Sequence, residues 1–213
     1  MNGFIFHPVE GAKYRRNYEK IARDLNVFRD KNDWKKAIEL IRKLCWDDLF
    51  FLMYFVLGWG DMNHPWLVDR ANEVNDNRHK TLDVWSRYHY KSSIITVAGT
   101  IQDALRDPMI RGCIFSHTKS IAKDFLRRIK TILETNGLLA AAFEDVIPAN
   151  PMNTKGWLWS LDDGLQLKCG NEIGGTLQAS GLIDSMPTGK HFTRRIYDDV
   201  VTREAVSTSE QRN

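Results

Sequence analysis

The sequence has few cysteines and no long apolar run. Its three cysteines, Cys45, Cys113 and Cys169, are far apart, form no CxxC pair and have no nearby histidine to complete a zinc site. An odd, scattered set argues against a disulfide framework and indicates reduced thiols. The longest apolar stretch, 49–57, is far shorter than the roughly 20 residues of a membrane-spanning helix, and no signal-peptide pattern opens the chain. We therefore expect a soluble protein of a reducing compartment, with no membrane partner.

A strong charge of either sign is also absent. The chain has 30 basic and 27 acidic side chains, a net charge of +3 that is too small to indicate nucleic-acid binding by itself. The hydrophobic share of 43% and the charged share of 27% are ordinary for globular domains. A length of 213 residues has room for one good-sized domain with a small appended lid. Composition therefore indicates a packed core and leaves the function open.

The first part of the chain has helical periodicity. Across 13–45, apolar residues such as Ile21, Leu25 and Phe28 recur at spacings of three and four, which is typical of an amphipathic helix. A second helix is predicted to begin near Asp47–Asp48, because acidic residues suit a helix N-terminus, and to stop at 58–60. The aromatic residues between these points are predicted to be core.

From residue 81 onward the pattern changes to alternating strands and helices. The predicted elements are a strand at 81–85, a helix at 91–105, a strand at 112–115, a helix at 120–133, a hairpin of 157–161 and 165–169 around Asp162-Asp163-Gly164, and a strand at 195–201. Such alternation predicts a parallel sheet covered by helices. Ligands of these folds bind at the carboxyl ends of the strands.

The segment 85–93, Trp-Ser-Arg-Tyr-His-Tyr-Lys-Ser-Ser, joins a predicted strand to a predicted helix. A phosphate-binding loop needs the free N–H groups of a helix N-terminus, a lysine for the outer phosphates and a hydroxyl for Mg²⁺. Lys91 and Ser92 stand in the last two places, whereas Trp85 and Tyr90 occupy usual glycine positions. On these residues alone, the sequence favours an ordinary strand-to-helix turn with a surface lysine over a phosphate-binding loop.

A carboxylate pair, Asp198-Asp199, lies in the apolar run 195–201. One carboxylate of such a pair can hold a metal, and the other can orient and deprotonate a water molecule. A carboxylate in a buried strand is costly unless it is paired or near a metal. The alternative is a strand-end carboxylate at the surface. The pair and the loop together favour an ATPase.

The segment Ser86–Ser92 resembles the deviant Walker A motif of the large subunits of tailed-phage DNA-packaging terminases, commonly written PRGHGKS. The matching residues are Arg87, His89, Lys91 and Ser92, and the departures are Ser86, Tyr88 and Tyr90. Other segments resemble the family in the same order: 57–58, 64–66, 94–96, 113–118 with Ala122 and Phe125, and 181–201, which ends in the Walker B-like Asp198-Asp199. The resemblance covers residues 45–205.

The resemblance implies an α/β fold of the RecA-like (ASCE) P-loop NTPase class, with a central, mostly parallel sheet. It implies an N-terminal helical lid or adenine-side wall at 1–75 and an ATPase core at 76–213, ending before the coupling motif and the nuclease domain, so that no DNA cleavage is expected. The implied activity is ATP hydrolysis with Mg²⁺ that powers translocation of double-stranded DNA into a procapsid. The implied partners are the portal protein, the small terminase subunit and further copies in a homo-oligomeric ring, in the host cell cytoplasm.

The resemblance also implies residue roles. Lys91 would contact the β- and γ-phosphates, Ser92 and Asp198 would hold Mg²⁺, Asp199 would be the catalytic base where many relatives have Glu, and Arg87 would stabilise the γ-phosphate. The other implied nucleotide-binding residues are Ser86, Tyr88, His89, Tyr90 and Ser93. The basic candidates for acting on a neighbouring subunit are Lys190, Arg194 and Arg195, and the adenine contacts are expected in 64–69.

Two alternatives stay open. Bulky side chains at Tyr88 and Tyr90 disfavour positive φ and close approach of the backbone to phosphate, which favours a nucleotide-binding module that has lost hydrolysis. A helicase-like or other nucleic-acid-dependent ATPase would share the same loop and carboxylates. Stimulation of turnover by DNA, and strand unwinding, would separate these classes.

Overall fold

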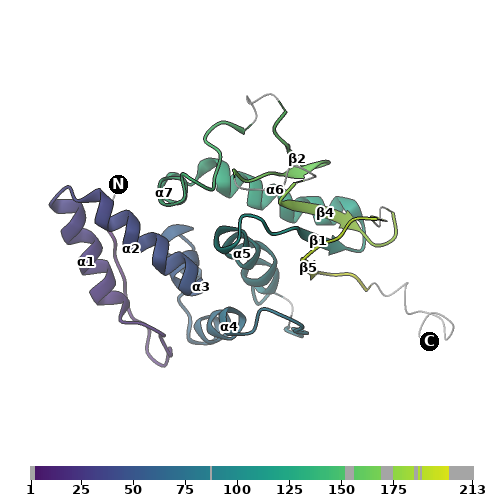
Figure 1. Cartoon of the computed structure of the whole chain (residues 1–213). Coiled ribbons are helices and arrows are strands. Elements are labelled where there is room, and N and C mark those ends of the chain that lie inside the picture. Colours follow the sequence, from purple (N-terminus) through teal and green to yellow (C-terminus); the bar gives the residue numbers. More distant parts are fainter. Residues whose placement is uncertain are drawn as a thin grey trace. The chain divides into compact units, whose positions relative to one another are not determined.

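The computed structural model describes residues 3–86, 88–151, 156–168, 175–184, 187 and 189–201. The chain forms two compact units: unit 1 comprises Met1–Gln102 with Thr135–Glu144, and unit 2 comprises Asp103–Glu134 with Asp145–Asn213. Unit 1 is helical in its described residues, and unit 2 contains the sheet (Figure 1).

The first two helices of unit 1 pack against each other (Figure 1). They are α1 (Tyr18–Asp30) and α2 (Trp34–Asp47), where the sequence predicted continuous helical periodicity over 13–45. The helix breaks because Asn32 adopts a left-handed conformation with φ of 56°, which its short polar side chain tolerates. Asp33 then begins α2 as its N-cap, accepting the Lys36 backbone N–H at 3.4 Å.

The second predicted helix is confirmed and has two parts, α3 (Leu49–Phe51) and the π-helical η1 (Leu52–Val56). Asp48 caps its start, because the carboxylate accepts the Phe51 backbone N–H at 2.9 Å. The turn at Gly58, with φ of 72°, follows its end. The short 3₁₀ helix η2 (Gly60–Met62) and then α4 (Pro65–Asp76) come next.

Aromatic side chains form part of the core of unit 1: the predicted burial is confirmed for Phe50 and Phe51, whereas Tyr54, Phe55 and Trp59 are half-buried. The ring of Phe6 contacts a cluster of rings that come from α1, α3, η1 and the segment before α1. The members of this cluster are Tyr14, Tyr18, Phe50, Tyr54 and Phe55, with ring centroids 5.1–6.5 Å from that of Phe6. Inside it the Tyr18 hydroxyl donates to Asp48 at 2.7 Å. Burial, followed by the nearby Asp48 charge, raises the pKa of Tyr18 well above its ordinary value.

The predicted strand at 81–85 does not form. Residues 81–86 have no regular secondary structure, and the apolar side chains that suggested a strand, Leu82 and Val84, are 90% and 84% exposed. A short alternating run becomes a strand only where a neighbouring strand takes its N–H and C=O groups. The helix predicted at 91–105 is confirmed as the π-helical η3 (Ser92–Gly99) followed by α5 (Thr100–Arg106). The last helix of unit 1, α7 (Gly137–Ala142), packs on α2.

Unit 2 is built on a five-stranded sheet with the order β2-β3-β4-β1-β5. The strands are β1 (Gly112–Ser116), β2 (Trp159–Ser160), β3 (Gly164–Leu165), β4 (Leu177–Gly181) and β5 (Arg194–Tyr197). Strands β4 and β5 run parallel to the central β1, and the predicted hairpin β2–β3 joins antiparallel to β4. The fold class is therefore α/β with a mixed sheet rather than a mostly parallel one.

The centre of unit 2 is β1, in which every residue is buried. Helix α6 (Lys119–Thr135) follows it and buries a stripe of residues at helical spacing: Ala122, Leu126, Ile129 and Leu133. Both elements were predicted, whereas β4 was not, because Leu-Gln-Ala-Ser-Gly has too few apolar or β-branched residues to indicate a strand. In the described part of the chain, every helix is too short or too polar to cross a membrane.

Candidate functional site

The predicted phosphate-loop residues lie in unit 1 at the start of η3. Lys91 is the residue that precedes η3, and Lys91, Ser92 and Ser93 are all half-buried there. The Ile94 backbone N–H donates to the Tyr90 carbonyl at 2.9 Å, so the helical hydrogen bonds begin inside the loop. Arg87 lies outside the described residues. The loop thus leads directly into a helix, as predicted, but it does not follow a strand.

Tyr88 and Tyr90 both have left-handed backbones, with φ of 64° and 59°. These are the two positions at which the PRGHGKS motif has glycine. A left-handed conformation costs an ordinary residue about 1–2 kcal/mol and is free for glycine. The loop therefore adopts a glycine-type backbone without glycine.

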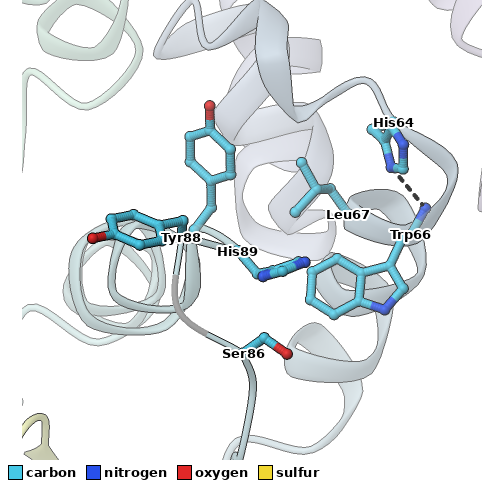
Figure 2. A pocket seen from close by; sticks show the side chains of 7 residues that line it. His64, Trp66, Leu67, Ser86, Tyr88 and His89 are labelled. Atoms are coloured by element: carbon cyan, nitrogen blue, oxygen red, sulfur yellow. Dashed lines mark hydrogen bonds between the residues drawn. The ribbon is translucent and has the colours of Figure 1, made fainter.

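A pocket of about 390 Å³ lies against this loop within unit 1 (Figure 2). The start of α4 contributes part of its lining and the loop contributes the rest: His64, Trp66, Leu67, Ser86, Tyr88, His89 and Tyr90. Its volume is at the lower end of the range of small-molecule sites. Of the segment 64–69, in which adenine contacts were expected, the pocket is lined by His64, Trp66 and Leu67.

Trp66 is the central aromatic group of the pocket. Its ring meets those of Trp85 and His89 edge-on, with centroids 5.3 and 5.1 Å away, and Figure 2 shows the His89 and Trp66 rings turned toward one another. The Arg70 guanidinium lies 5.8 Å from the Trp66 ring centroid. His64 caps α4, because its Nδ1 accepts the Trp66 backbone N–H at 3.3 Å. Trp66 is therefore held on the first turn of α4.

The carboxylate pair lies in unit 2, directly after β5. The sequence placed Asp198 and Asp199 inside a strand, but β5 ends at Tyr197. Asp198 is 2% exposed, and its backbone N–H donates to Phe115 at 2.9 Å. Asp199 is exposed and has a φ of 49°. Because this left-handed residue bends the chain, the ladder shifts and His117 donates its backbone N–H to the Asp199 carbonyl at 3.3 Å.

The carboxyl ends of β1, β4 and β5 thus carry polar groups at one edge of the sheet. Ser116 ends β1 and is fully buried, and its hydroxyl has no hydrogen-bond partner among the described residues. The Nδ1 atom of His117 is likewise buried without a partner in that part of the chain. Asp184, after β4, accepts the Lys119 backbone N–H at 3.0 Å and so caps α6. The sequence did not indicate Ser116, because nothing distinguishes it from any polar residue that ends a strand.

The three basic residues near β5 have different surroundings. Lys190 is exposed and donates to the Gln178 side chain at 2.8 Å. Arg194 pairs with Asp103 at 2.9 Å, and the two side chains are only 14% and 12% exposed. Arg195 is exposed. Of the three, Arg194 has a structural role within unit 2, so Lys190 and Arg195 are the better candidates for contacts with another molecule.

A metal ion would find few protein ligands here. Among the described residues, no three His, Cys, Asp or Glu side chains are grouped as they would be in an all-protein metal cage. The oxygens of Ser92 in unit 1 and of Asp198 in unit 2 are hard donors of the kind that Mg²⁺ prefers. Because Mg²⁺ keeps several waters and uses one or two carboxylates together with substrate phosphates, the oxygen donors of each unit, taken separately, suit Mg²⁺ better than zinc, which takes nitrogen and sulfur ligands.

No family model, curated protein or solved structure matches the chain. What the fold and the site define is an α/β protein with a glycine-type loop at a helix start in unit 1 and a carboxylate pair at the carboxyl end of parallel strands in unit 2.

Proposed function

We propose that this chain is a P-loop ATPase, the motor domain of a DNA-packaging terminase large subunit. The observation that carries the proposal is the loop backbone, in which Tyr88 and Tyr90 both adopt positive φ at the glycine positions of the motif. An ordinary turn has no need for two strained tyrosines at this spacing, whereas a loop that presents its N–H groups to an anion does. This favours the phosphate loop over the surface-turn alternative.

The pocket also supports the proposal, because it offers a place for the nucleobase. Trp66 and His89 offer apolar, aromatic surfaces of the kind on which a nucleobase stacks, and the loop that lines the pocket continues into Lys91 and Ser92. In the proposed complex the base occupies the pocket and the phosphates extend toward the first turn of η3. Lys91 then neutralises charge on the outer phosphates, and the Ser92 hydroxyl serves Mg²⁺.

The reaction assigned to the carboxylates is hydrolysis of the γ-phosphoryl group. Mg²⁺ neutralises phosphate charge when it is bound. Asp198 has the hard oxygen donors for that ion, and Asp199 accepts a proton from the attacking water. The water oxygen forms a bond to the γ-phosphorus, the bond to the bridging oxygen breaks, and ADP leaves with that electron pair. Asp199 suits the base role because it is exposed and lies just after the end of β5.

The coupled process that we propose is translocation of double-stranded DNA into a procapsid. Contacts to DNA would be made mainly to backbone phosphates and would be insensitive to sequence. Exposed basic residues such as Lys190 and Arg195 are available for DNA or for the nucleotide of a neighbouring copy. The portal protein and the small terminase subunit are the further partners in this proposal, and the assembly is a homo-oligomeric ring in the cytoplasm of the host cell.

The test is ATP turnover at high protein concentration, with and without DNA. Lys91→Ala and Asp199→Asn should each lower the rate by about a hundredfold or more, because each removes a group that acts on the transition state. Asp163→Asn, in the exposed hairpin turn, is the matched carboxylate control and should leave the rate unchanged. Rates that survive both site substitutions would rule out the assignment.

The remaining outcomes separate the alternatives. Magnesium-dependent ATP binding that Lys91→Ala abolishes, without turnover, would identify a nucleotide-binding module. DNA-stimulated turnover with strand unwinding would identify a helicase-like enzyme. Neither turnover nor binding that depends on Lys91 would leave only the α/β fold.

A further inference from the structure

Ser116 has a buried hydroxyl for which the fold supplies no hydrogen-bond partner. The residue is 0% exposed, and its Oγ has no partner among the described residues. Buried hydroxyls are nearly always satisfied by protein groups or by ordered water, because leaving one unpaired is costly. The hydroxyl therefore indicates a ligand or a water that belongs to this place.

The neighbour of Ser116 on one side is Asp198. Strands β1 and β5 are parallel, with the register Gly112↔Arg194 through Phe115↔Tyr197, and the bond from the Asp198 N–H to the Phe115 carbonyl carries that register forward. Ser116 therefore lies opposite Asp198. Opposed residues of adjacent strands share a face and lie about 5 Å apart. The side chains of Ser116 and Asp198 thus extend from adjacent backbone positions on one face of the sheet.

The neighbour on the other side is Gly181 of β4, which is paired with Ser116. A β-carbon at Gly181 would overlap Oδ1 of Asp184, so the Asp184 carboxylate occupies the space above this glycine. Both Asp184 oxygens already accept the Lys119 backbone N–H at 3.0 Å. Ser116 consequently lies between two carboxylates, of which Asp184 is engaged by α6, and it is hydrogen-bonded to neither.

We propose that the Ser116 hydroxyl helps Asp198 to hold the water shell of a divalent cation at the carboxyl end of β1 and β5. Serine and carboxylate oxygens suit Mg²⁺, which retains most of its waters and needs further acceptors to orient them. Ser116 acts through those waters and is a positioning residue. The inference deepens the proposed function, since the ion would be the one that accompanies ATP, and it adds a residue outside the recognised motifs.

The test measures Mn²⁺ binding to the full chain by electron paramagnetic resonance, without nucleotide and with ATP. Ser116→Ala should weaken binding about three- to tenfold, the loss expected for one hydrogen bond. Ser116→Thr keeps the hydroxyl and should restore most of the affinity. Ser180→Ala is the matched control: Ser180 is also a buried serine, on β4, but it pairs with Phe115 and so points to the other face. This control should bind Mn²⁺ as the unaltered chain does.

Unchanged Mn²⁺ affinity in Ser116→Ala, equal loss in Ser180→Ala, or no Mn²⁺ binding by the unaltered chain would each overturn the inference. Thermal unfolding of each variant shows whether it is folded. ATP turnover of the same proteins is read separately. Mn²⁺ binding that depends on Ser116, in a chain that never hydrolyses ATP, would support the cation site and reject the proposed function. ATP turnover whose magnesium requirement is the same in Ser116→Ala as in the unaltered chain would support the proposed function and reject the role of Ser116.

Discussion

Three residues other than glycine adopt a left-handed backbone conformation at the candidate sites. Tyr88 and Tyr90 do so in the loop, and Asp199 does so after β5. Strain of this kind persists only where surrounding structure imposes it, and it gathers at functional sites. From the sequence, the tyrosines were expected to disfavour this geometry, yet both adopt it. The sequence could not indicate that the loop would adopt the geometry anyway, because that depends on how η3 and the preceding turn are held.

Relief of this strain should be measurable at Tyr88. The side chain is 97% exposed, so Tyr88→Gly removes few contacts while it frees a left-handed residue. The strain released exceeds the added entropy of the unfolded chain, and the free energy of unfolding in urea should rise by up to about 1 kcal/mol. Tyr88→Ala is the control, because it removes the same ring but keeps the β-carbon. Equal stability of the two variants would show that backbone strain is not the cause.

Cys113 should make the protein less stable at alkaline pH. Burial raises the pKa of this thiol to about 12, above its ordinary value in the unfolded chain. Because the folded-state pKa is the higher one, the stabilisation is complete below about pH 8.5 and is lost as pH rises toward the folded value, by up to about 1.4 kcal/mol per pH unit. The stability cost of Cys113→Ala should therefore be smaller at pH 9.5 than at pH 7.5.

The control for this pH dependence is Ile114→Val, a truncation at the next residue of β1, which is also buried and does not titrate. Its stability cost should be the same at both pH values. A cost of Cys113→Ala that is equally independent of pH would show that the thiol does not contribute to the alkaline loss. Unfolding in urea at the two pH values measures both variants.

At the scale of elements, short polar side chains decide where helices begin and end. The starts of α2, α3 and α4 are capped by Asp33, Asp48 and His64. The left-handed Asn32 separates α1 from α2. Periodicity predicted that helices occupy these regions, since it follows the buried stripe. It did not locate the break at Asn32, because a left-handed asparagine leaves the apolar spacing nearly intact. The prediction of a strand at 81–85 was wrong, because alternating apolar and polar residues form a strand only where a partner strand is present.

Asn136 connects two elements of unit 1. Its Oδ1 accepts the Leu139 backbone N–H at 2.8 Å and caps α7, and its Nδ2 donates to the Val56 carbonyl at the end of η1 at 2.6 Å. Asn136→Ala removes both bonds and should lower the free energy of unfolding by about 1–2 kcal/mol. Asn136→Ser keeps a capping oxygen and loses the amide donor, so a smaller loss is expected. If the serine variant is no more stable than the alanine variant, the lost stability comes from the Val56 hydrogen bond and not from the cap.

At the scale of the whole molecule, the predicted active residues belong to different compact units. Lys91 and Ser92 lie in unit 1, and Asp198 and Asp199 lie in unit 2. If Lys91 and Asp199 act on one nucleotide, the ATP turnover rate of the double variant Lys91→Ala, Asp199→Asn should be no lower than that of the worse single variant. Fully multiplicative losses would show that the two residues act independently. A cycle of Lys91→Ala with Asp163→Asn serves as the uncoupled reference.

The sequence by itself predicted the local features of this protein, because each of them depends on residues that are close together in the chain. Helical spacing predicted α1, α2 and α6, acidic residues predicted the helix start at α3, and the Asp-Asp-Gly turn predicted the β2–β3 hairpin. The lysine-serine and aspartate pairs are the basis of the proposed site. The strand β4, the mixed sheet and the exposure of 81–86 were decided by tertiary structure, since pairing depends on partners far along the chain. Ser116 lies beside Asp198 for the same reason: 82 positions separate the two residues, and only the parallel pairing of β1 with β5 brings them together.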